Sequence, residues 1–181
     1  TLEAARLLEP NDLSVYIGIP FCPTRCAYCS FVSESVERFG EFLPPYLDCL
    51  LREIEYTGAL LARSGWHIRS LYMGGGTLST PQMARLLDAI RGSFDLSRCL
   101  EFTVEGGRPD TLDLEKLKAI RAGGATRMSI NPQTMSDSVL RAIGRRHTAA
   151  QTVAAFRLAQ EAGFDDINMD LIAGLPGDTP E

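Results

Sequence analysis

The chain has 181 residues, which is long enough for one domain with a sizeable core. Hydrophobic residues make up 45% and charged residues 23%, as in ordinary globular proteins, and the formal net charge is −5. This acidic balance argues against nucleic-acid binding, and no apolar run reaches the ~20 residues of a membrane-spanning helix. No apolar segment typical of a signal peptide is visible near the start, so we expect a cytoplasmic protein without membrane insertion.

Short β-rich segments alternate with segments of helical periodicity along the chain. The predicted strands are Ser14–Ile19, Ser70–Met73, Glu101–Val104, Thr126–Ile130 and Asp166–Ile172. The predicted helices are Phe42–Leu61, Pro81–Ile90, Leu112–Ala122, Asp137–Ile143 and Thr148–Ala162. Alternation of this kind indicates an α/β protein made of βαβ units around a parallel sheet.

Every predicted strand is followed by an unusual polar or glycine-rich sequence. Barrel enzymes build their sites from the loops at the carboxyl ends of several strands, whereas a doubly wound sheet has one switch point. Five such loops therefore favour a barrel, and five strands are too few to close one. We expect residues 1–13 to form an N-terminal lead-in. Residues 14–181 would form the core domain, in an excerpt of a longer protein that stops after the fifth strand.

Three of the five cysteines fall within eight residues, in the sequence Cys22-Pro-Thr-Arg-Cys26-Ala-Tyr-Cys29. This clustering favours a metal or redox site over a disulfide framework. Three thiolates on one loop can each ligate one iron of a 4Fe–4S cluster, which leaves the fourth iron open. The alternative is structural zinc, which usually has four ligands in two pairs, and no fourth Cys or His lies nearby in the sequence.

The two remaining cysteines have a plainer interpretation. Cys49 and Cys99 lie in apolar segments, and free cysteine behaves as a small hydrophobe. We therefore expect both to be buried packing residues.

Several polar residues after the predicted strands are candidates for ligand binding. The run Gly74-Gly75-Gly76-Thr77 allows a backbone to approach a ligand closely, although such a run is more often only a turn. Glu105 is either a solvated carboxylate or a ligand contact. The planar guanidinium of Arg145 suits a carboxylate. Asp170 lies in an apolar segment, where an unpaired buried carboxylate would be costly, so it is either paired or faces the site.

The motifs together resemble the radical S-adenosylmethionine (SAM) superfamily. More narrowly, they resemble the oxygen-independent coproporphyrinogen III oxidases, in particular the branch called coproporphyrinogen dehydrogenase-like. The resemblance covers roughly residues 14–177 and rests on Tyr16-Ile-Gly-Ile-Pro-Phe-Cys22 with the rest of the cysteine motif, Gly74-Gly-Gly-Thr77, Val104-Glu-Gly-Gly-Arg-Pro-Asp110, Arg127-Met-Ser-Ile-Asn-Pro-Gln133, Ile143-Gly-Arg-Arg-His147 and Asn168-Met-Asp-Leu-Ile-Ala-Gly-Leu-Pro176.

This resemblance implies a partial, open radical SAM TIM-type barrel of parallel strands, with five of about six strands present. It also implies two cofactors, a 4Fe–4S cluster on Cys22, Cys26 and Cys29 and SAM on its open iron. One electron from the cluster would cleave SAM to a 5′-deoxyadenosyl radical. The residues implied to contact SAM are Tyr16, Tyr28, Gly75, Gly76, Thr77, Glu105, Gln133, Arg145 and Asp170. For the two tyrosines, ordinary barrel packing is the alternative.

The function that the resemblance implies is oxidative decarboxylation of coproporphyrinogen III, in which propionate side chains become vinyl groups. Its partners would be this porphyrinogen-type small molecule and an electron donor such as flavodoxin or ferredoxin. One paralogous branch resembles these enzymes but delivers haem, so a haem-binding chaperone is the alternative. Radical chemistry on another substrate is a third interpretation.

Overall fold

A computed structural model describes residues 8–31 and 33–179 and shows an α/β fold built on one parallel sheet. The strand order is β1-β4-β5-β6-β7, so each strand pairs with its predecessor in this series. The bounds are β1 (Asp12–Ile19), β4 (His67–Gly75), β5 (Glu101–Gly107), β6 (Arg127–Ile130) and β7 (Asp166–Asn168). A second pair joins β2 (Phe21–Cys22) to β3 (Glu34–Ser35). Most of the expected lead-in, residues 1–7, lies outside the described residues.

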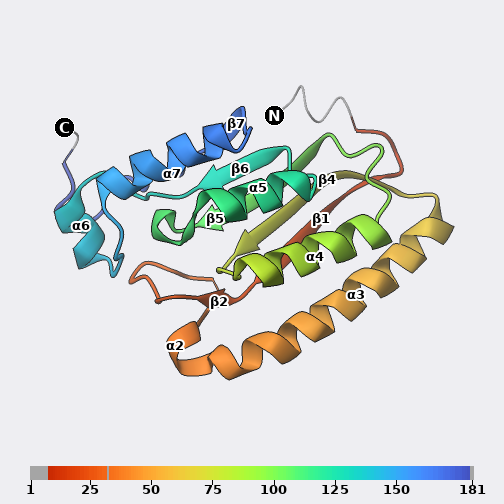
Figure 1. The fold of residues 1–181 in the computed structure, drawn as a ribbon, viewed down its shortest axis with the longest axis horizontal. Helices are drawn as coiled ribbons and strands as arrows, with labels where there is room; N and C mark the ends of the chain where they lie inside the picture. Colours follow the sequence, from red (N-terminus) through yellow and green to blue (C-terminus); the bar gives the residue numbers. More distant parts are fainter. Residues whose placement is uncertain (1–7, 32, 180–181) are drawn as a thin grey trace.

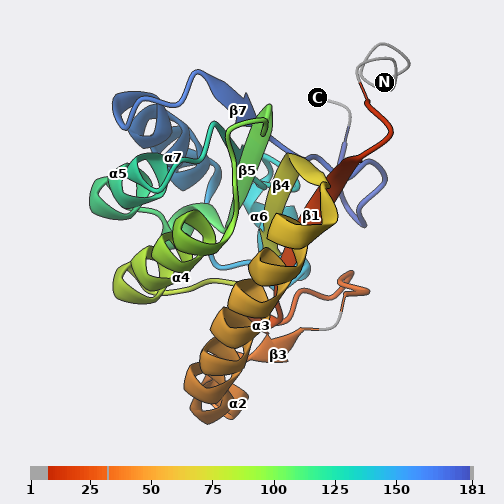
Figure 2. The same ribbon diagram turned by 90° about the vertical axis from the view of Figure 1, so that its right-hand side faces the viewer.

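Helices cover one face of the five-stranded sheet. The helices are α2 (Val36–Phe39), α3 (Leu43–Ser64), α4 (Thr80–Ser93), α5 (Leu114–Ala122), α6 (Asp137–Ala142) and α7 (Ala149–Glu161), with 3₁₀ turns η1 (Gly40–Phe42) and η2 (Pro109–Thr111). Helix α3 packs on α4, α4 on α5, and α5 on α7. Figure 2 shows these four helices on the same side of the sheet. The sheet is open, as predicted for a partial barrel.

The helix ends follow from local sequence signals. Prolines occupy the first turn of α3, where a backbone N–H is not needed, and the helix ends at Gly65 with a φ of 71°. Before α4, the Gln82 side chain accepts a hydrogen bond from the backbone N–H of Ser79 (2.9 Å). Before α7, the Thr148 hydroxyl accepts from the N–H of Gln151 (3.2 Å). These signals agree with the positions of α3, α4 and α7, each of which lies within a few residues of its predicted range, whereas the short helix α2 was not predicted.

The hydrophobic core lies between the sheet and the helices. Alternate strand residues such as Phe102 and Val104 point into it, and α4 contributes Leu87 and Ile90. Cys49 was expected in this core, but it is exposed. It lies on the solvent side of α3, whose buried face is formed by the residues Leu43, Leu47, Leu50, Leu51, Ile54 and Gly58. Cys99 is only half-buried, at the edge of the core.

The fifth predicted strand is the one that differs most from expectation. Asp166–Ile172 was predicted, whereas β7 ends at Asn168 because only three of its residues pair with β6. Beyond it, a single bridge joins Leu171 to Gln133. Asp170 is therefore exposed in a connecting segment and not buried in a strand. Among the described residues, no helix is long and apolar enough to cross a bilayer.

Candidate functional site

A cavity of about 650 Å³ opens at the carboxyl ends of the parallel strands. In Figure 1 the arrowheads of β4 and β6 point toward the end of the molecule where β2 and α6 lie. Five residues that belong to five different predicted strands or to the loops after them were expected to meet at this edge. All five line the cavity: Cys22, Gly75, Glu105, Gln133 and Asp170. Parallel strands explain this convergence, because their carboxyl ends share one rim.

All three clustered cysteines line this cavity. Cys22 ends β2, and the N–H of Cys29 donates to the carbonyl of Cys26 (3.1 Å), which closes a tight turn. Burial raises the pKa of Cys22, and the neighbouring thiols of Cys29 and Cys26 raise it further, as expected where sulfurs lie near one another.

Within the part of the chain that the structure describes, no three Cys, His, Asp or Glu side chains could share one metal ion. A 4Fe–4S cluster makes a different demand, because each thiolate bonds its own iron and the sulfurs need not converge on one point. Three thiols that line one cavity therefore fit the cluster.

The cysteine loop is attached to the segment after α6. The N–H of Ala27 donates to the carbonyl of Ile143 (3.0 Å). Arg145 donates from Nε and Nη2 to the Tyr28 hydroxyl, at 3.2 and 2.7 Å. Burial raises the pKa of Tyr28 to about 12, although the Arg145 guanidinium acts in the opposite direction. Tyr28 is therefore a neutral phenol, and it connects the loop to Arg145.

Arg145 is a buried cation that forms no ion pair among the described residues. Its residue is 8% exposed, and its Nη1 donates to the Asn131 carbonyl (3.2 Å). None of the ion pairs among the described residues includes it. An uncompensated buried charge is costly. Because Arg145 lines the cavity, an anionic ligand there would supply the missing partner.

Glu105 reaches the same cavity from the end of β5. Its Oε2 accepts from the N–H of Gly75 (2.8 Å), and its Oε1 accepts from the side-chain amide of Asn131. Burial raises the pKa of Glu105, while the Gly75 N–H lowers it. A Cβ on Gly74 would lie 2.8 Å from this carboxylate, so glycine at that position leaves room for it. Glu105 is therefore not a fully solvated surface carboxylate, which was the alternative interpretation of this residue.

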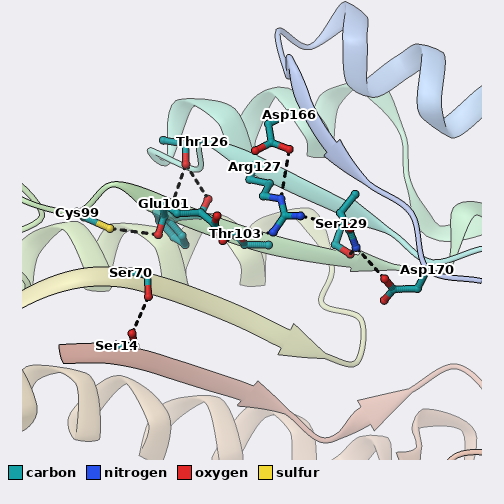
Figure 3. A network of polar contacts seen from close by, with 12 residues as sticks. Ser14, Ser70, Cys99, Glu101, Thr103, Thr126, Arg127, Ser129, Asp166 and Asp170 are labelled. Atoms are coloured by element: carbon teal, nitrogen blue, oxygen red, sulfur yellow. Dashed lines mark hydrogen bonds and ion pairs between the residues drawn. The ribbon is translucent and has the colours of Figure 1, made fainter. Parts of the chain in front are cut away.

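Asn131 connects Glu105 and Arg145, and the sequence interpretation assigned it no role. Besides these two contacts, its side-chain oxygen accepts from the Ser129 hydroxyl (2.9 Å). Asn168 then donates to Ser129 (3.2 Å) and to Asp170 (2.8 Å). Figure 3 shows part of this polar network on the sheet face opposite the helices. The alternation of Arg127, Ser129 and Asn131 with apolar residues was the sequence signal for a polar face.

The glycine-rich segment contributes its residues unequally. Gly75, with a φ of 104°, and Thr77 line the cavity. Gly76 was expected to contact the cofactor, but it is not among the lining residues. A Cβ on Gly76 would lie 1.7 Å from the carbonyl oxygen of Phe21. Glycine is required there because the segment packs against the backbone of β2.

Gln133 and Asp170 meet through their backbones. The Gln133 N–H donates to the Asp170 carbonyl (3.0 Å), and the Gln133 carbonyl accepts from the N–H of Ile172 (2.8 Å). Gln133 has a φ of 72°, a left-handed conformation that is uncommon for a residue with a side chain. Such backbone strain is found most often at functional sites.

Tyr16 of β1 stacks on Tyr72 of β4, with ring centroids 5.9 Å apart. Tyr16 is 63% exposed, so it is not an ordinary packing residue of a dry barrel core. Both rings line the cavity, and Tyr72 was not singled out from the sequence. Tyr28, described above, also lines it and is half-buried.

The fold and the cysteine-lined cavity agree with the comparison to known families. The Radical SAM superfamily matches residues 16–181, and the chain belongs to this superfamily. Its cofactors are accordingly a 4Fe–4S cluster and SAM.

The chain is also similar to several named relatives. It is 40% identical over 172 residues to the oxygen-independent coproporphyrinogen-III oxidase-like protein HemZ of Bacillus subtilis, covering 93% of this chain and 34% of the relative. It is 38% identical over 174 residues to the heme chaperone HemW of Bacillus subtilis, covering 92% of this chain and 44% of the relative. It is 34% identical over 183 residues to the oxygen-independent coproporphyrinogen III oxidase of Escherichia coli, covering 99% and 39%.

Among solved structures, the coproporphyrinogen III oxidase HemN from Escherichia coli matches with a TM-score of 0.82 and 32% identity. The match covers 99% of this chain and 41% of HemN. The chain thus spans less than half the length of these relatives, and their names include both an oxidase and a chaperone.

Proposed function

We propose that this chain is the cofactor-binding part of a radical SAM oxidoreductase that acts on coproporphyrinogen III or a closely related porphyrinogen. The observation that carries the cofactor assignment is the buried Arg145, which lacks an ion pair among the described residues and shares a cavity with three cysteines. A cofactor that binds iron and also carries a carboxylate, as SAM does, satisfies both features.

Each group of residues has its own role in this proposal. Cys22, Cys26 and Cys29 would ligate three irons, and when bound the cluster and SAM supply a radical that abstracts hydrogen. Arg145 would donate to the SAM carboxylate, a geometry that guanidinium favours. Glu105 keeps lone pairs free beyond its two present contacts, which suits the hydroxyls of a ribose.

The remaining predicted contacts would orient SAM on the cluster. Gly75 and Thr77 offer backbone and hydroxyl groups at the end of β4, beside the cysteine loop. Tyr16 presents an exposed aromatic face to the cavity. Gln133 and Asp170 line the same cavity and are held together by the backbone pairing described above. An electron donor such as flavodoxin or ferredoxin would reduce the cluster.

The substrate proposal is supported by the relatives named for coproporphyrinogen oxidation, and by the match to HemN over nearly the whole chain. The second candidate function is haem delivery. It is favoured by the similarity to the heme chaperone HemW of Bacillus subtilis, whose identity of 38% is close to the 40% of the oxidase-like relative. The two functions differ in whether a product forms.

The deciding experiment is an anaerobic assay of the whole protein with its reconstituted cluster, SAM, a one-electron reductant and coproporphyrinogen III. Mass spectrometry should detect products that have lost carbon dioxide from one or two propionates. A parallel titration with haem tests the second candidate. Stoichiometric haem binding without any decarboxylated product would reject the oxidoreductase and leave the chaperone.

Measuring the cluster content of the same samples distinguishes a missing cofactor from a wrong substrate. Iron and acid-labile sulfide should each approach four per chain after reconstitution. Stoichiometric zinc without sulfide would contradict the cluster itself, whatever the substrate. A loaded cluster that cleaves SAM but leaves coproporphyrinogen III unchanged would reject only the substrate.

A further inference from the structure

An irregularity in β5 brings a second charged residue to the cavity. The pairing of β5 with β6 shifts register between Glu105 and Gly107, and Gly107 has a φ of 66°. Such bulges re-aim the side chains that follow them. As a result Glu105 and Arg108, three residues apart, both line the cavity. Glu105 has a role in the proposed function, whereas Arg108 has none there.

Arg108 is 5% exposed and is fixed in place by Asp110. Its Nε donates to Oδ1 of Asp110 (3.1 Å), and its Nη2 donates to Oδ2 (3.0 Å). This two-point contact fixes the plane of the guanidinium and neutralises its charge. Burial of a charged pair is acceptable only when the remaining donors are also satisfied, so the position of the third nitrogen is informative.

That third nitrogen, Nη1, donates to the hydroxyl of Thr24, within the cysteine loop. The Thr24 hydroxyl in turn donates to the carbonyl of Gly144 (3.3 Å). One hydroxyl thus accepts from the segment after β5 and donates to the segment after α6. Thr24 stands between Cys22 and Cys26, so both of these cysteines are within two residues of this contact.

From these contacts we infer that Arg108 is a positioning residue for the iron–sulfur cluster, acting through the Thr24 hydroxyl. The Asp110 carboxylate fixes the orientation of the Arg108 guanidinium, and the guanidinium fixes the position of the Thr24 hydroxyl. Thr24 in turn keeps the loop in the conformation that presents the cysteine thiolates to the cavity. This inference rests on the proposed cluster ligands.

The test measures how fast the reconstituted whole protein releases iron to a ferrous chelator under anaerobic conditions. Thr24→Val removes the hydroxyl at nearly constant shape, and Thr24→Ser retains it as the matched control. Loss of a hydrogen bond from a charged donor should speed iron release of Thr24→Val by about tenfold. Thr24→Ser should stay within about twofold of the parent protein. Circular dichroism gives the melting temperature of each Thr24 variant. Iron release is then measured well below both melting temperatures, so that a difference in rate does not come from unfolding.

A double-mutant cycle identifies Arg108 as the partner. Arg108→Gln with Asp110→Asn removes both charges together and avoids leaving one buried alone. If Arg108 acts through Thr24, adding Thr24→Val to this pair should speed iron release much less than it does in the parent, because the Arg108–Thr24 contact is already lost and only the contact with the Gly144 carbonyl remains to be removed. Multiplicative effects of the two changes would overturn the inference. So would equal release rates for Thr24→Val and Thr24→Ser.

The outcomes that reject the positioning role of Arg108 differ from those that reject the assignment of the cluster ligands. If Cys22→Ala keeps the iron and sulfide of the parent, the ligand assignment is wrong and the inference falls with it. If Cys22→Ala loses the cluster while Thr24→Val releases iron at the parent rate, the ligands stand and only the positioning role is rejected.

Discussion

Replacing Arg145 with alanine should weaken SAM binding without removing the iron–sulfur cluster. Arg145 lies beside the cysteine loop but supplies no thiolate, so cluster ligands remain in Arg145→Ala. Arg146→Ala is the matched control, since it removes the same charge at the next position. Arg146 is exposed and forms a surface ion pair with Glu37 (3.2 Å).

The magnitude follows from the hydrogen-bonding capacity of the guanidinium. Two of its N–H groups go to Tyr28 and one goes to the Asn131 carbonyl. An arginine has five such donors, so two remain for a ligand in the cavity. Losing a charge-assisted hydrogen bond costs about 1.5–3 kcal/mol, or roughly a tenfold to hundredfold rise in Kd. Exposed ion pairs contribute little, so Arg146→Ala should change Kd by less than about threefold.

Anaerobic calorimetric titration of SAM into each reconstituted variant gives Kd directly, and iron analysis of the same samples checks the cluster. A Kd for Arg145→Ala within about twofold of the parent, with the cluster intact, would refute the reasoning. It would mean that this buried cation has no anionic partner in the bound state. Loss of the cluster in Arg145→Ala would instead show that its contact with Tyr28 is needed by the cysteine loop.

Three further predictions concern the cluster, the packing of the helices and a buried imidazole. Alanine at any one of the clustered cysteines should abolish the 4Fe–4S absorbance and its acid-labile sulfide, whereas Cys49→Ala should leave both unchanged, because Cys49 is exposed on α3. Gly58→Ala should destabilise the fold in urea unfolding, since its Cβ would lie 2.3 Å from the Ser93 carbonyl oxygen. Gly92→Ala, whose Cβ would have no contact within 4 Å among the described residues beyond its own helix backbone, should stabilise the protein by about 0.5–1 kcal/mol. Equal effects of the two would contradict this packing. His147 is 2% exposed, its ring nitrogens have no hydrogen-bond partner in the described part of the chain, and burial lowers its pKa. The unfolded chain therefore binds the proton more readily, and stability should fall as the pH drops below about 6.5. His147→Gln should reduce this loss between pH 7.5 and 5.5, and an identical pH profile for the variant would contradict it.

The periodic parts of the fold were predictable from the sequence because periodicity reports burial directly. Apolar spacing located α3, α4, α5 and α7, and glycines or cap residues located their ends. The short β7 was overestimated for a related reason. The apolar character of residues 166–172 continues beyond the point where β6 offers backbone partners, so hydrophobicity alone could not mark the end of the strand.

The residues around the cavity were predictable where residue type and spacing together indicate the ligand, as they do for the clustered cysteines. The roles of Asn131 and Arg108 were not predictable in this way. Asn131 meets Glu105 only because Ser129 pairs with Glu105 in the β5–β6 register, and register between distant segments is not encoded locally. Arg108 reaches the cavity only because of the bulge at Gly107. Gly76 is the opposite case. It belongs to a conspicuous motif, but glycine is needed there because the segment packs against the backbone of β2.

The sheet order repeats the chain order, and this has a consequence for how the molecule assembles. Each strand of the series β1, β4, β5, β6 and β7 docks on the one made before it, and helices α3, α4, α5 and α7 do the same. Each strand–helix unit therefore contacts mainly the units next to it in sequence. Repeat proteins share this arrangement, and each of their units is stabilised mainly by the adjacent ones. Among the described strands of this series, β7 has the fewest residues paired with a neighbour, three with β6, so its amide hydrogens should exchange before those of β4 and β5. Because Arg145 precedes α7 and Asp170 follows β7, a local opening of the α7–β7 unit would disturb the cofactor pocket without unfolding the strands at the β1 side of the sheet.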